Sequence, residues 1–157
     1  LSRALINRPS VLLLDEPLAA LDRQLREEMQ HELKLLQARL GTTFVFVTHD
    51  LGVVAQFCDR VAVMYAGRIV ESARVADLFR APRHPYTGAL LASTPTLDSP
   101  KDQPLATIEG MVPAPAQRGP GCTFAPRCAR AGERCRAEAP ALIPDGDRAV
   151  ACFHPLS

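Results

Sequence analysis

The chain has 157 residues, a length that accommodates one ordinary domain or a domain with a small appendage. The formal net charge of +1 argues against a generic DNA- or RNA-binding protein, which needs a basic surplus to neutralise phosphates. The apolar fraction of 47% suffices for a packed core, but no apolar run approaches the ~18 residues that span a bilayer, so membrane insertion is not expected.

The start of the chain predicts a piece of a longer protein. Its first residue is Leu1 rather than Met, and the segment LSRALINRP lacks the charged head, apolar stretch and small-residue cleavage site of a secretory signal. We therefore expect more chain to precede this sequence, and we do not expect secretion.

The first part of the chain alternates helix and strand patterns. Leu1 to Asn7 is typical of the end of a helix, which the following proline stops. Val11 to Asp15 is a continuous apolar run, typical of a strand that is buried on both faces. From Arg23 to Leu40 apolar residues recur at helical spacing, and the next residue, Gly41, favours a helix end. Thr43 to Thr48 predicts a second strand, parallel to the first through a right-handed crossover.

The next segment predicts a β-hairpin and two short helices. Val61 to Ser72 contains two strand-like runs around the turn dipeptide Ala66-Gly67. Helices are expected at Val75 to Arg80 and, with proline in its first turn, at Pro85 to Ser93. The expected fold class is therefore α/β, with parallel strands, helices and a terminal β-hairpin.

Composition changes near residue 95. Ten of the 14 prolines lie from Pro95 onward, and four of the 5 cysteines lie from Cys122 onward. A proline-rich segment with few large apolar side chains buries too little surface to fold unaided, and it needs cross-links, a metal or a partner. We predict two parts, an α/β part over residues 1–94 and a small cysteine- and proline-rich extension over residues 95–157.

Polar residues follow both predicted parallel strands. Asp15 and Glu16 come after the first strand, and His49 and Asp50 come after the second. In an open parallel sheet such residues line the ligand crevice. One carboxylate suits Mg²⁺, a hard cation that prefers oxygen ligands, and the next suits a water positioned for attack on phosphorus. A polar strand exit and a capping or core histidine are the alternatives when each is taken alone.

Several of these motifs together resemble a known family. The segments VLLLDEP, LAALD (Leu18 to Asp22), FVTHD and VAVMYAGRIVE occur in this order around the long helix. They resemble the distal half of the ATP-binding subunit of ABC transporters, a P-loop ATPase domain. The resemblance covers Leu1 to about Ser93, and it identifies VLLLDEP as the Walker B strand and LAALD as the D-loop.

The resemblance implies a role for each matching residue. Asp15 would hold Mg²⁺ through water, Glu16 would act on the attacking water, and His49 would contact the γ-phosphate of ATP. Asp22, in the D-loop, would reach across an ATP-bridged dimer of ATPase subunits to the opposite site. ATP and Mg²⁺ are therefore the expected cofactors.

Other motifs of the family do not occur in this sequence. No G-x-x-x-x-G-K-[ST] loop is present, and such a loop cradles the phosphates with its backbone N–H groups and lysine. The glutamine loop and the LSGGQ-type signature are missing as well. We therefore expect ATPase activity of the full-length protein, and neither tight ATP binding nor hydrolysis by this chain alone.

The rest of the sequence resembles one branch of the family. RHPYTGALLASTP (Arg83 to Pro95), IEGMVPAP and GCTFAPRCARAGERC resemble the C-terminal extension of the dipeptide, oligopeptide and nickel importer ATPases. This implies peptide import at the cytoplasmic face of the membrane, with transmembrane permease subunits, a second ATPase subunit (homodimer or heterodimer) and, indirectly, an extracytoplasmic solute-binding protein. No nucleic-acid partner is expected.

Two alternatives to a peptide importer stay open. LAALDRQLREEMQHELKLLQ looks more like the corresponding helix of sugar- or polyamine-type importers, where peptide-type relatives often read TTALD. An ATPase of a sugar, polyamine or nickel importer is therefore one alternative. A soluble ABC ATPase without a transporter is the other, and the HPYT stretch and cysteine extension argue against it.

Four cysteines of the extension are candidate metal ligands. None of them forms the C-x₂-C knuckle of common zinc ribbons, and stable disulfides are rare in a reducing cytosol. Four thiolates in a segment with a small apolar core favour a structural metal site. An iron–sulfur cluster is favoured over zinc, and free thiols are the third alternative. The resemblance also favours a 4Fe-4S cluster. The candidate ligands are Cys122, Cys128, Cys135 and Cys152.

Two more residues bear on that hypothesis. Cys58 is expected in a helix after His49, as an ordinary core residue. His154 is close enough to Cys152 to replace a ligand, but a solvated tail histidine is the favoured interpretation. A further alternative is that the extension is a redox- or metal-sensing module for which the ATPase is only a carrier.

Overall fold

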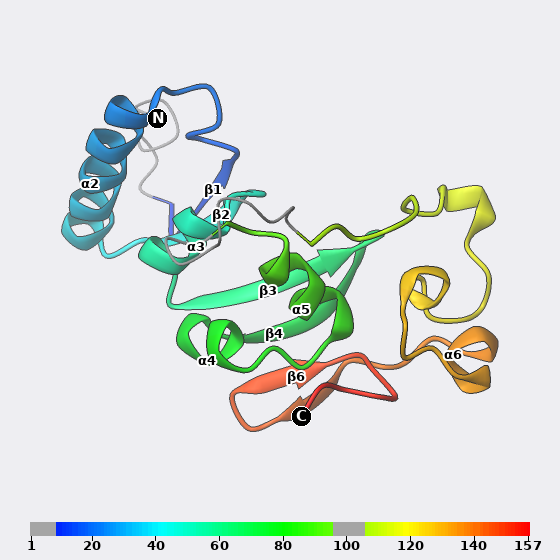
Figure 1. Cartoon of the computed structure of the whole chain (residues 1–157). Helices are drawn as coiled ribbons and strands as arrows, with labels where there is room; N and C mark the ends of the chain where they lie inside the picture. The colour runs from blue at the N-terminus through cyan, green and yellow to red at the C-terminus, as the bar shows by residue number, and fades with distance from the viewer. Residues whose placement is uncertain (1–8, 96–105) are drawn as a thin grey trace. The chain divides into compact units, whose positions relative to one another are not determined.

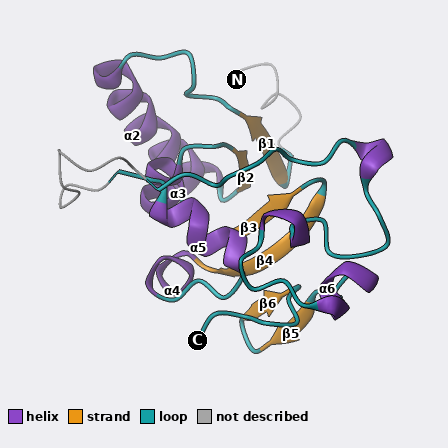
Figure 2. Cartoon of the chain, turned by 45° about the vertical axis from the view of Figure 1, so that its right-hand side comes forward, coloured by secondary structure: helices purple, strands orange, loops and turns teal. Residues whose placement is uncertain are grey.

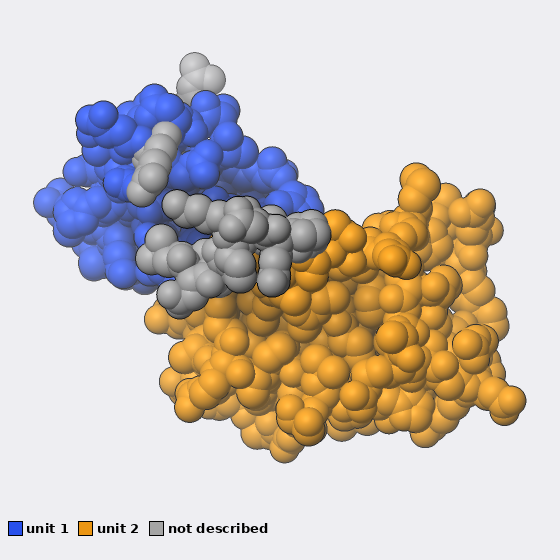
Figure 3. Space-filling view, in the orientation of Figure 1, with its two compact units in different colours: residues 1–57 blue, residues 58–157 orange. Residues whose placement is uncertain are grey.

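The computed structural model describes residues 9–95 and 106–157 (Figure 1). The chain divides into two compact units, residues 1–57 and residues 58–157, which Figure 3 shows in two colours. This division differs in position from the boundary predicted at 94/95, which separates two compositions and stays a prediction about domains. The helix expected at Leu1 to Asn7 lies outside the described residues.

The first unit has the strand, helix, strand order that the sequence predicts. Strands β1 and β2 pair in parallel, and Asp15 at the end of β1 lies opposite Val47 at the end of β2. Helix α2 begins at the cap residue Asp22, and it ends at Gly41, whose φ of 60° is easily reached by glycine. The elements are β1 (Val11–Asp15), α2 (Arg23–Leu40), β2 (Thr43–Val47) and α3 (Leu51–Phe57).

The core of the first unit lies on one face of its two strands. Leu12 and Leu14 of β1 are buried, and they belong to one cluster with Leu18, Leu33 and Val53. Residues that alternate with them point to the opposite face, as strand geometry requires. Their exposed fractions are 53% at Val11, 64% at Leu13, 42% at Val45 and 48% at Val47. The prediction of a strand buried on both faces is therefore wrong for the described residues, because their elements cover only one face.

The second unit is built on an antiparallel sheet with strand order β3-β4-β6-β5. The predicted hairpin and both short helices are confirmed. Unforeseen by the sequence, the extension adds two strands to this sheet, and β6 pairs with β4 through Glu71 and Val150 (Figure 2). The elements are β3 (Arg60–Tyr65), β4 (Arg68–Arg74), α4 (Val75–Arg80), α5 (Pro85–Ala92), η1 (Pro115–Gln117), η2 (Ala125–Arg127), α6 (Glu133–Ala137), β5 (Ile143–Asp145) and β6 (Arg148–Val150).

Side chains from both sides of residue 95 share the core of this second unit. Phe124 of the extension is 3% exposed and belongs to one cluster with Tyr65 and Leu78. Its ring centroid lies 5.1 Å from that of Tyr65 and 5.4 Å from that of Tyr86. The extension therefore folds onto the hairpin and α5. No helix in residues 9–95 or 106–157 is both long and apolar enough to cross a membrane.

Candidate functional site

A cleft of about 360 Å³ lies where β1 and β2 end. Glu16 and His49, the two residues predicted to be catalytic, both line it, and Glu16 Oε1 lies 3.7 Å from His49 Nε2. The imidazole of His49 is 98% exposed, so a ligand can reach it from solvent. The parallel pairing of the strands is the cause of this proximity, because it puts both carboxyl ends at one edge of the sheet.

Glu16 has an unusual backbone conformation. Its φ of 42° lies in the left-handed region, which costs a residue with a side chain about 1–2 kcal/mol. The Glu16 N–H donates a hydrogen bond to the carbonyl of Val47 at 2.8 Å, so the chain turns sharply right after β1. Strained residues of this kind cluster at functional sites. This turn accounts for the position of the carboxylate at the cleft.

The loop after β2 is held by its own polar side chains. The Asp50 N–H donates to Thr48 Oγ1 at 3.0 Å. Asp50 Oδ1 then accepts the N–H groups of Gly52 at 2.8 Å and Val53 at 3.2 Å, which caps the start of α3. His49 sits between Thr48 and Asp50, so its backbone is fixed on both sides.

Arg26, which no sequence motif indicated, also lines the cleft. Its Nη1 donates to Asp50 Oδ2 at 3.3 Å, and its Nη2 donates to the carbonyl of Leu21 at 3.1 Å. Its Nε is buried without a hydrogen-bond partner among the described residues. Arg26 thus joins the segment after His49 to the segment before α2. No sequence signal separates it from the other charged residues of this helix.

The other two predicted site residues lie outside the lining of the cleft. Asp15 ends β1 and is exposed. Asp22 caps α2, because its Oδ1 accepts the N–H of Leu25 at 2.9 Å. This capping role is compatible with the predicted D-loop role, and both the Mg²⁺ role of Asp15 and the dimer role of Asp22 stay predictions.

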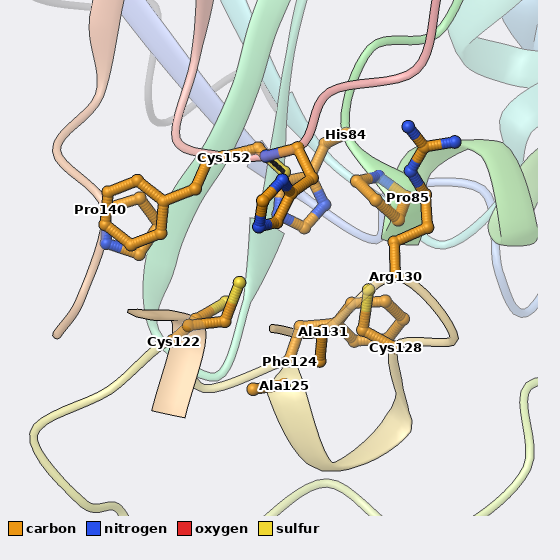
Figure 4. A pocket seen from close by; sticks show the side chains of 13 residues that line it. His84, Pro85, Cys122, Phe124, Ala125, Cys128, Arg130, Ala131, Pro140 and Cys152 are labelled. Atoms are coloured by element: carbon orange, nitrogen blue, oxygen red, sulfur yellow. Dashed lines mark hydrogen bonds between the residues drawn. The ribbon is translucent and has the colours of Figure 1, made fainter. Parts of the chain in front are cut away.

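The four cysteines of the extension line one pocket in the second unit. In Figure 4, Cys122 and Cys128 extend from one side toward Cys152 and His84 on the other. All four thiols are free. Among the described residues, no three His, Cys, Asp or Glu side chains are placed to hold one metal ion. The fold therefore gathers the predicted ligands around one space without forming a single-ion cage.

A close approach of backbones brings two of these cysteines together. The Cys122 N–H donates to the carbonyl of Cys135 at 2.8 Å. A Cβ on the preceding Gly121 would lie 2.4 Å from the carbonyl oxygen of Arg136, which is closer than atoms can pack. Glycine is thus required there. The sequence GC at this position is the signal that could have indicated it.

The sulfur atoms of the pocket receive backbone N–H groups. Cys152 Sγ accepts the N–H of His154 at 3.4 Å. Burial raises the pKa of the Cys122 thiol, and hydrogen bonds from the backbone of Phe124 and Ala125 counteract part of this rise. Burial likewise raises the pKa of Cys152, and the N–H of His154 acts against it. These two thiols are therefore protonated at neutral pH unless a cation stabilises their thiolates.

His84, a residue of the RHPYT segment, also lines the pocket, and it was not among the predicted site residues. It is 1% exposed, and its Nδ1 accepts the N–H of Tyr86 at 3.0 Å, which caps α5. Burial lowers the pKa of His84 to about 4, and the charge of Glu71 opposes this shift. A histidine directly before a proline that starts a helix is a capping pattern, and this signal was available in the sequence.

Glu71 holds the backbone around His84. It is 1% exposed, and its carboxylate accepts the N–H groups of Arg83 and His84, each at 2.8 Å. Arg148 of β6 donates to the same carboxylate at 3.2 Å. A buried carboxylate with three donors fixes the chain that carries His84 against both β4 and the extension.

The structure also places the two secondary candidates. Cys58 follows α3 instead of lying within it, and its thiol is half-buried; burial, and then the charge of Asp59, raises its pKa. His154 is exposed, as favoured, although it also lines the cysteine pocket.

Known proteins resemble this chain over nearly its full length. Residues 70–135 match the family described as the oligopeptide/dipeptide transporter, C-terminal region. The oligopeptide transport ATP-binding protein AppD of Bacillus subtilis is 44% identical over 151 residues, which are 96% of this chain and 46% of the relative. The dipeptide transport ATP-binding protein DppF of Haemophilus influenzae is 40% identical over 155 residues, which are 98% of this chain and 47% of the relative.

A solved structure is similar as well. The structure of cbiO1 from Clostridium perfringens, part of the ABC transporter complex cbiONQ, is 38% identical with a TM-score of 0.45. It covers 48% of this chain and 30% of that one.

These matches confirm the resemblance to the ATP-binding proteins of peptide-type ABC transporters. The family match includes His84 and three of the four cysteines, Cys122, Cys128 and Cys135. The chain spans about half the length of these relatives, at 46% and 47%.

Proposed function

We propose that this chain is the distal part of the ATP-hydrolysing subunit of an ABC importer for peptides or a related solute. The observation that carries the proposal is the cleft where Glu16 Oε1 and His49 Nε2 lie 3.7 Å apart at the end of a parallel strand pair. The identity with oligopeptide and dipeptide transport ATP-binding proteins supports the same function.

In the proposed mechanism each polar residue at the strand ends has its own task. Asp15, exposed at the end of β1, binds Mg²⁺ of MgATP through water. Glu16 accepts a proton from the attacking water, and its turned backbone points the carboxylate into the cleft. His49 donates a hydrogen bond to the γ-phosphate. Asp22 contributes to the opposite site of an ATP-bridged dimer.

The test uses the full-length protein. Glu16→Gln removes the proton acceptor and keeps the shape, so we expect turnover to fall by about 10²–10⁴-fold while ATP binding is retained. Asp15→Asn should weaken Mg²⁺-dependent ATP binding and turnover together, and His49→Ala should behave like Glu16→Gln. Steady-state ATPase rates and equilibrium ATP titrations distinguish these cases. Near-normal turnover of Glu16→Gln would refute the assignment.

The importer supplies the partners of the proposed subunit. It would sit peripherally at the cytoplasmic face of the membrane, bound to permease subunits and paired with a second ATPase subunit. An extracytoplasmic solute-binding protein would act with it indirectly. Co-purification of the full-length protein with permease subunits from membranes tests this arrangement, and recovery of the protein without any membrane partner would contradict it.

We also propose that the four cysteines hold an iron–sulfur cluster of the 4Fe-4S type. Their thiols line one pocket, and the sulfur atoms of Cys122 and Cys152 receive backbone N–H groups, as cluster thiolates commonly do. Structural zinc sites are tetrahedral, with cysteine sulfurs at about 2.3 Å from the ion and histidine nitrogens as further ligands. Zinc held by the same cysteines is the alternative to the cluster.

Elemental analysis of full-length protein purified without oxygen tests this second proposal. Iron with acid-labile sulfide, lost in Cys128→Ser and kept in Cys58→Ser, is the expected result. Zinc at one per chain would support the alternative, and neither metal in a well-folded protein would exclude both.

A further inference from the structure

His84 brings a hydrogen-bond donor to the cysteine pocket. Its ring lines the pocket together with all four cysteines, and it is 1% exposed (Figure 4). Its ring centroid lies 5.9 Å from that of Phe124, which lies between Cys122 and Cys128 in the sequence. The ring is thus part of the wall of the pocket.

The hydrogen bonds of the ring define where its proton lies. Nδ1 accepts the N–H of Tyr86 at 3.0 Å, so Nδ1 carries no proton. An imidazole whose Nδ1 accepts an N–H is neutral, because the charged ring carries a proton on both nitrogens. In a neutral imidazole the proton then resides on Nε2. His84 therefore offers one donor, Nε2–H, and no positive charge.

That donor has no acceptor in the protein. None of the residues in 9–95 and 106–157 accepts a hydrogen bond from Nε2. The Nε2–H therefore stays available to a group that occupies the pocket, whose wall His84 shares with the four cysteines. The rest of the pocket wall nearby consists largely of sulfur atoms and apolar groups.

Hydrogen bonds to a buried carboxylate fix the backbone that carries the His84 ring. Glu71, itself 1% exposed, accepts the N–H of His84 at 2.8 Å and also the N–H of Arg83. Arg148 donates to the same carboxylate from β6, the strand that leads to Cys152. The carboxylate thus ties the chain carrying His84 to the chain carrying one of the cysteines. The Nε2–H direction is set before any ligand binds.

From these observations we infer that His84 is a positioning residue of the four-cysteine site, and that its Nε2–H donates a hydrogen bond to a sulfur of the group held there. This inference rests on the proposed cysteine site. It assigns a task to the HPYT segment, which the proposed ATPase mechanism does not use. Hydrogen bonds to sulfur stabilise added negative charge, so this donor raises the reduction potential of a bound cluster.

The test compares two serine variants of full-length protein, reconstituted anaerobically with Fe²⁺ and sulfide. His84→Ser keeps a hydroxyl that can cap α5 and removes the pocket donor. His154→Ser removes the exposed imidazole of the same pocket as a matched control. The midpoint potential is measured by a dye-mediated redox titration, and hydrogen exchange in α5 monitors the cap. We expect a more negative potential in His84→Ser only, with exchange in α5 preserved.

Each result decides the inference. A cluster with unchanged potential in His84→Ser overturns it and leaves the cluster proposal intact. If the protein takes up Zn²⁺ instead, chelator competition should show roughly 10- to 100-fold weaker Zn²⁺ binding in His84→Ser, and equal binding overturns the inference. Protein that takes up neither iron with sulfide nor Zn²⁺ overturns the proposed site and this inference together.

Discussion

Arg26 joins two functional segments at the edge of the cleft. It contacts Asp50, which follows the proposed γ-phosphate ligand His49, and the carbonyl of Leu21, which precedes the proposed D-loop residue Asp22. Since the Arg26 side chain is 35% exposed, the ion pair by itself adds little stability. We expect Arg26 to orient the cleft, because one planar guanidinium fixes two loops relative to each other.

Substitution of Arg26 in the full-length protein tests this link. Arg26→Met should lower kcat by about 10- to 100-fold with a small change in the KM for ATP, since misplacement by an ångström is costly to catalysis. Steady-state kinetics measure both constants. Asp50→Asn is the matched variant, because asparagine still caps α3. The double variant should lose no more than Arg26→Met alone, and fully additive losses would contradict the link.

The buried His84 predicts an acid-sensitive fold. Its pKa is about 4 in the folded chain against about 6.5 when unfolded, so between these values the unfolded state binds more protons. The free energy of unfolding should therefore be unaffected above pH 6.5 and should fall toward pH 4, by up to about 3 kcal/mol. Denaturant titrations of metal-free protein at several pH values measure this. His84→Ser should flatten the profile, and an unchanged slope in that variant would assign the effect elsewhere.

The β3–β4 hairpin contains a locally strained turn. Both central residues are left-handed, with φ of 49° at Ala66 and 79° at Gly67. This conformation matches the twist of the strands, but only glycine, asparagine and aspartate adopt it readily. The register of the hairpin brings Val63 and Tyr65 to the core in spite of this strain.

We predict that Ala66→Gly stabilises the protein by about 0.5–1 kcal/mol, because glycine removes the Cβ strain at positive φ. Thermal or denaturant unfolding measures the change. Ala62→Gly is the control in the adjacent strand β3, where the residue is exposed and extended, and it should destabilise the protein by about the same amount. Equal destabilisation by both substitutions would show that the turn is not strained.

At the scale of the molecule, the extension and the hairpin form one folding unit. Phe124 packs against Tyr65, and β6 pairs with β4. A group bound by the cysteines would therefore stabilise the hairpin as well as the extension, since its binding energy adds to the free energy of folding. These two contacts cross the predicted boundary at 94/95.

The corresponding prediction concerns hydrogen exchange in full-length, metal-loaded protein. Cys128→Ser should increase exchange in the extension and also in β3, β4 and α5, while exchange in β1 and β2 changes little. Cys58→Ser, which lies outside the pocket, should leave the whole pattern unchanged. If the increase in Cys128→Ser stopped at the extension, the shared core would not couple the two parts.

The local pattern of the sequence was sufficient to predict the helices and strands of residues 9–94 and the polar residues at the strand ends. Helical spacing with Asp22 and Gly41 at its ends defined α2, and the apolar run of β1 placed Glu16 directly at a strand exit. These features depend on residues adjacent in sequence, so a pattern reveals them. The four cysteines were likewise recognisable by type, and the structure places them around one pocket.

Contacts between distant segments were decided only by the tertiary structure. The pairing of β6 with β4, the link from Arg26 to Asp50 and the carboxylate of Glu71 beneath His84 join residues 13 to 79 positions apart. Nothing in the local sequence marks such pairs, because hydrophobic spacing reports which side chains face a core but not which segments meet there. His84 could be assigned to the cysteine pocket only once the fold had brought the HPYT segment and the extension together.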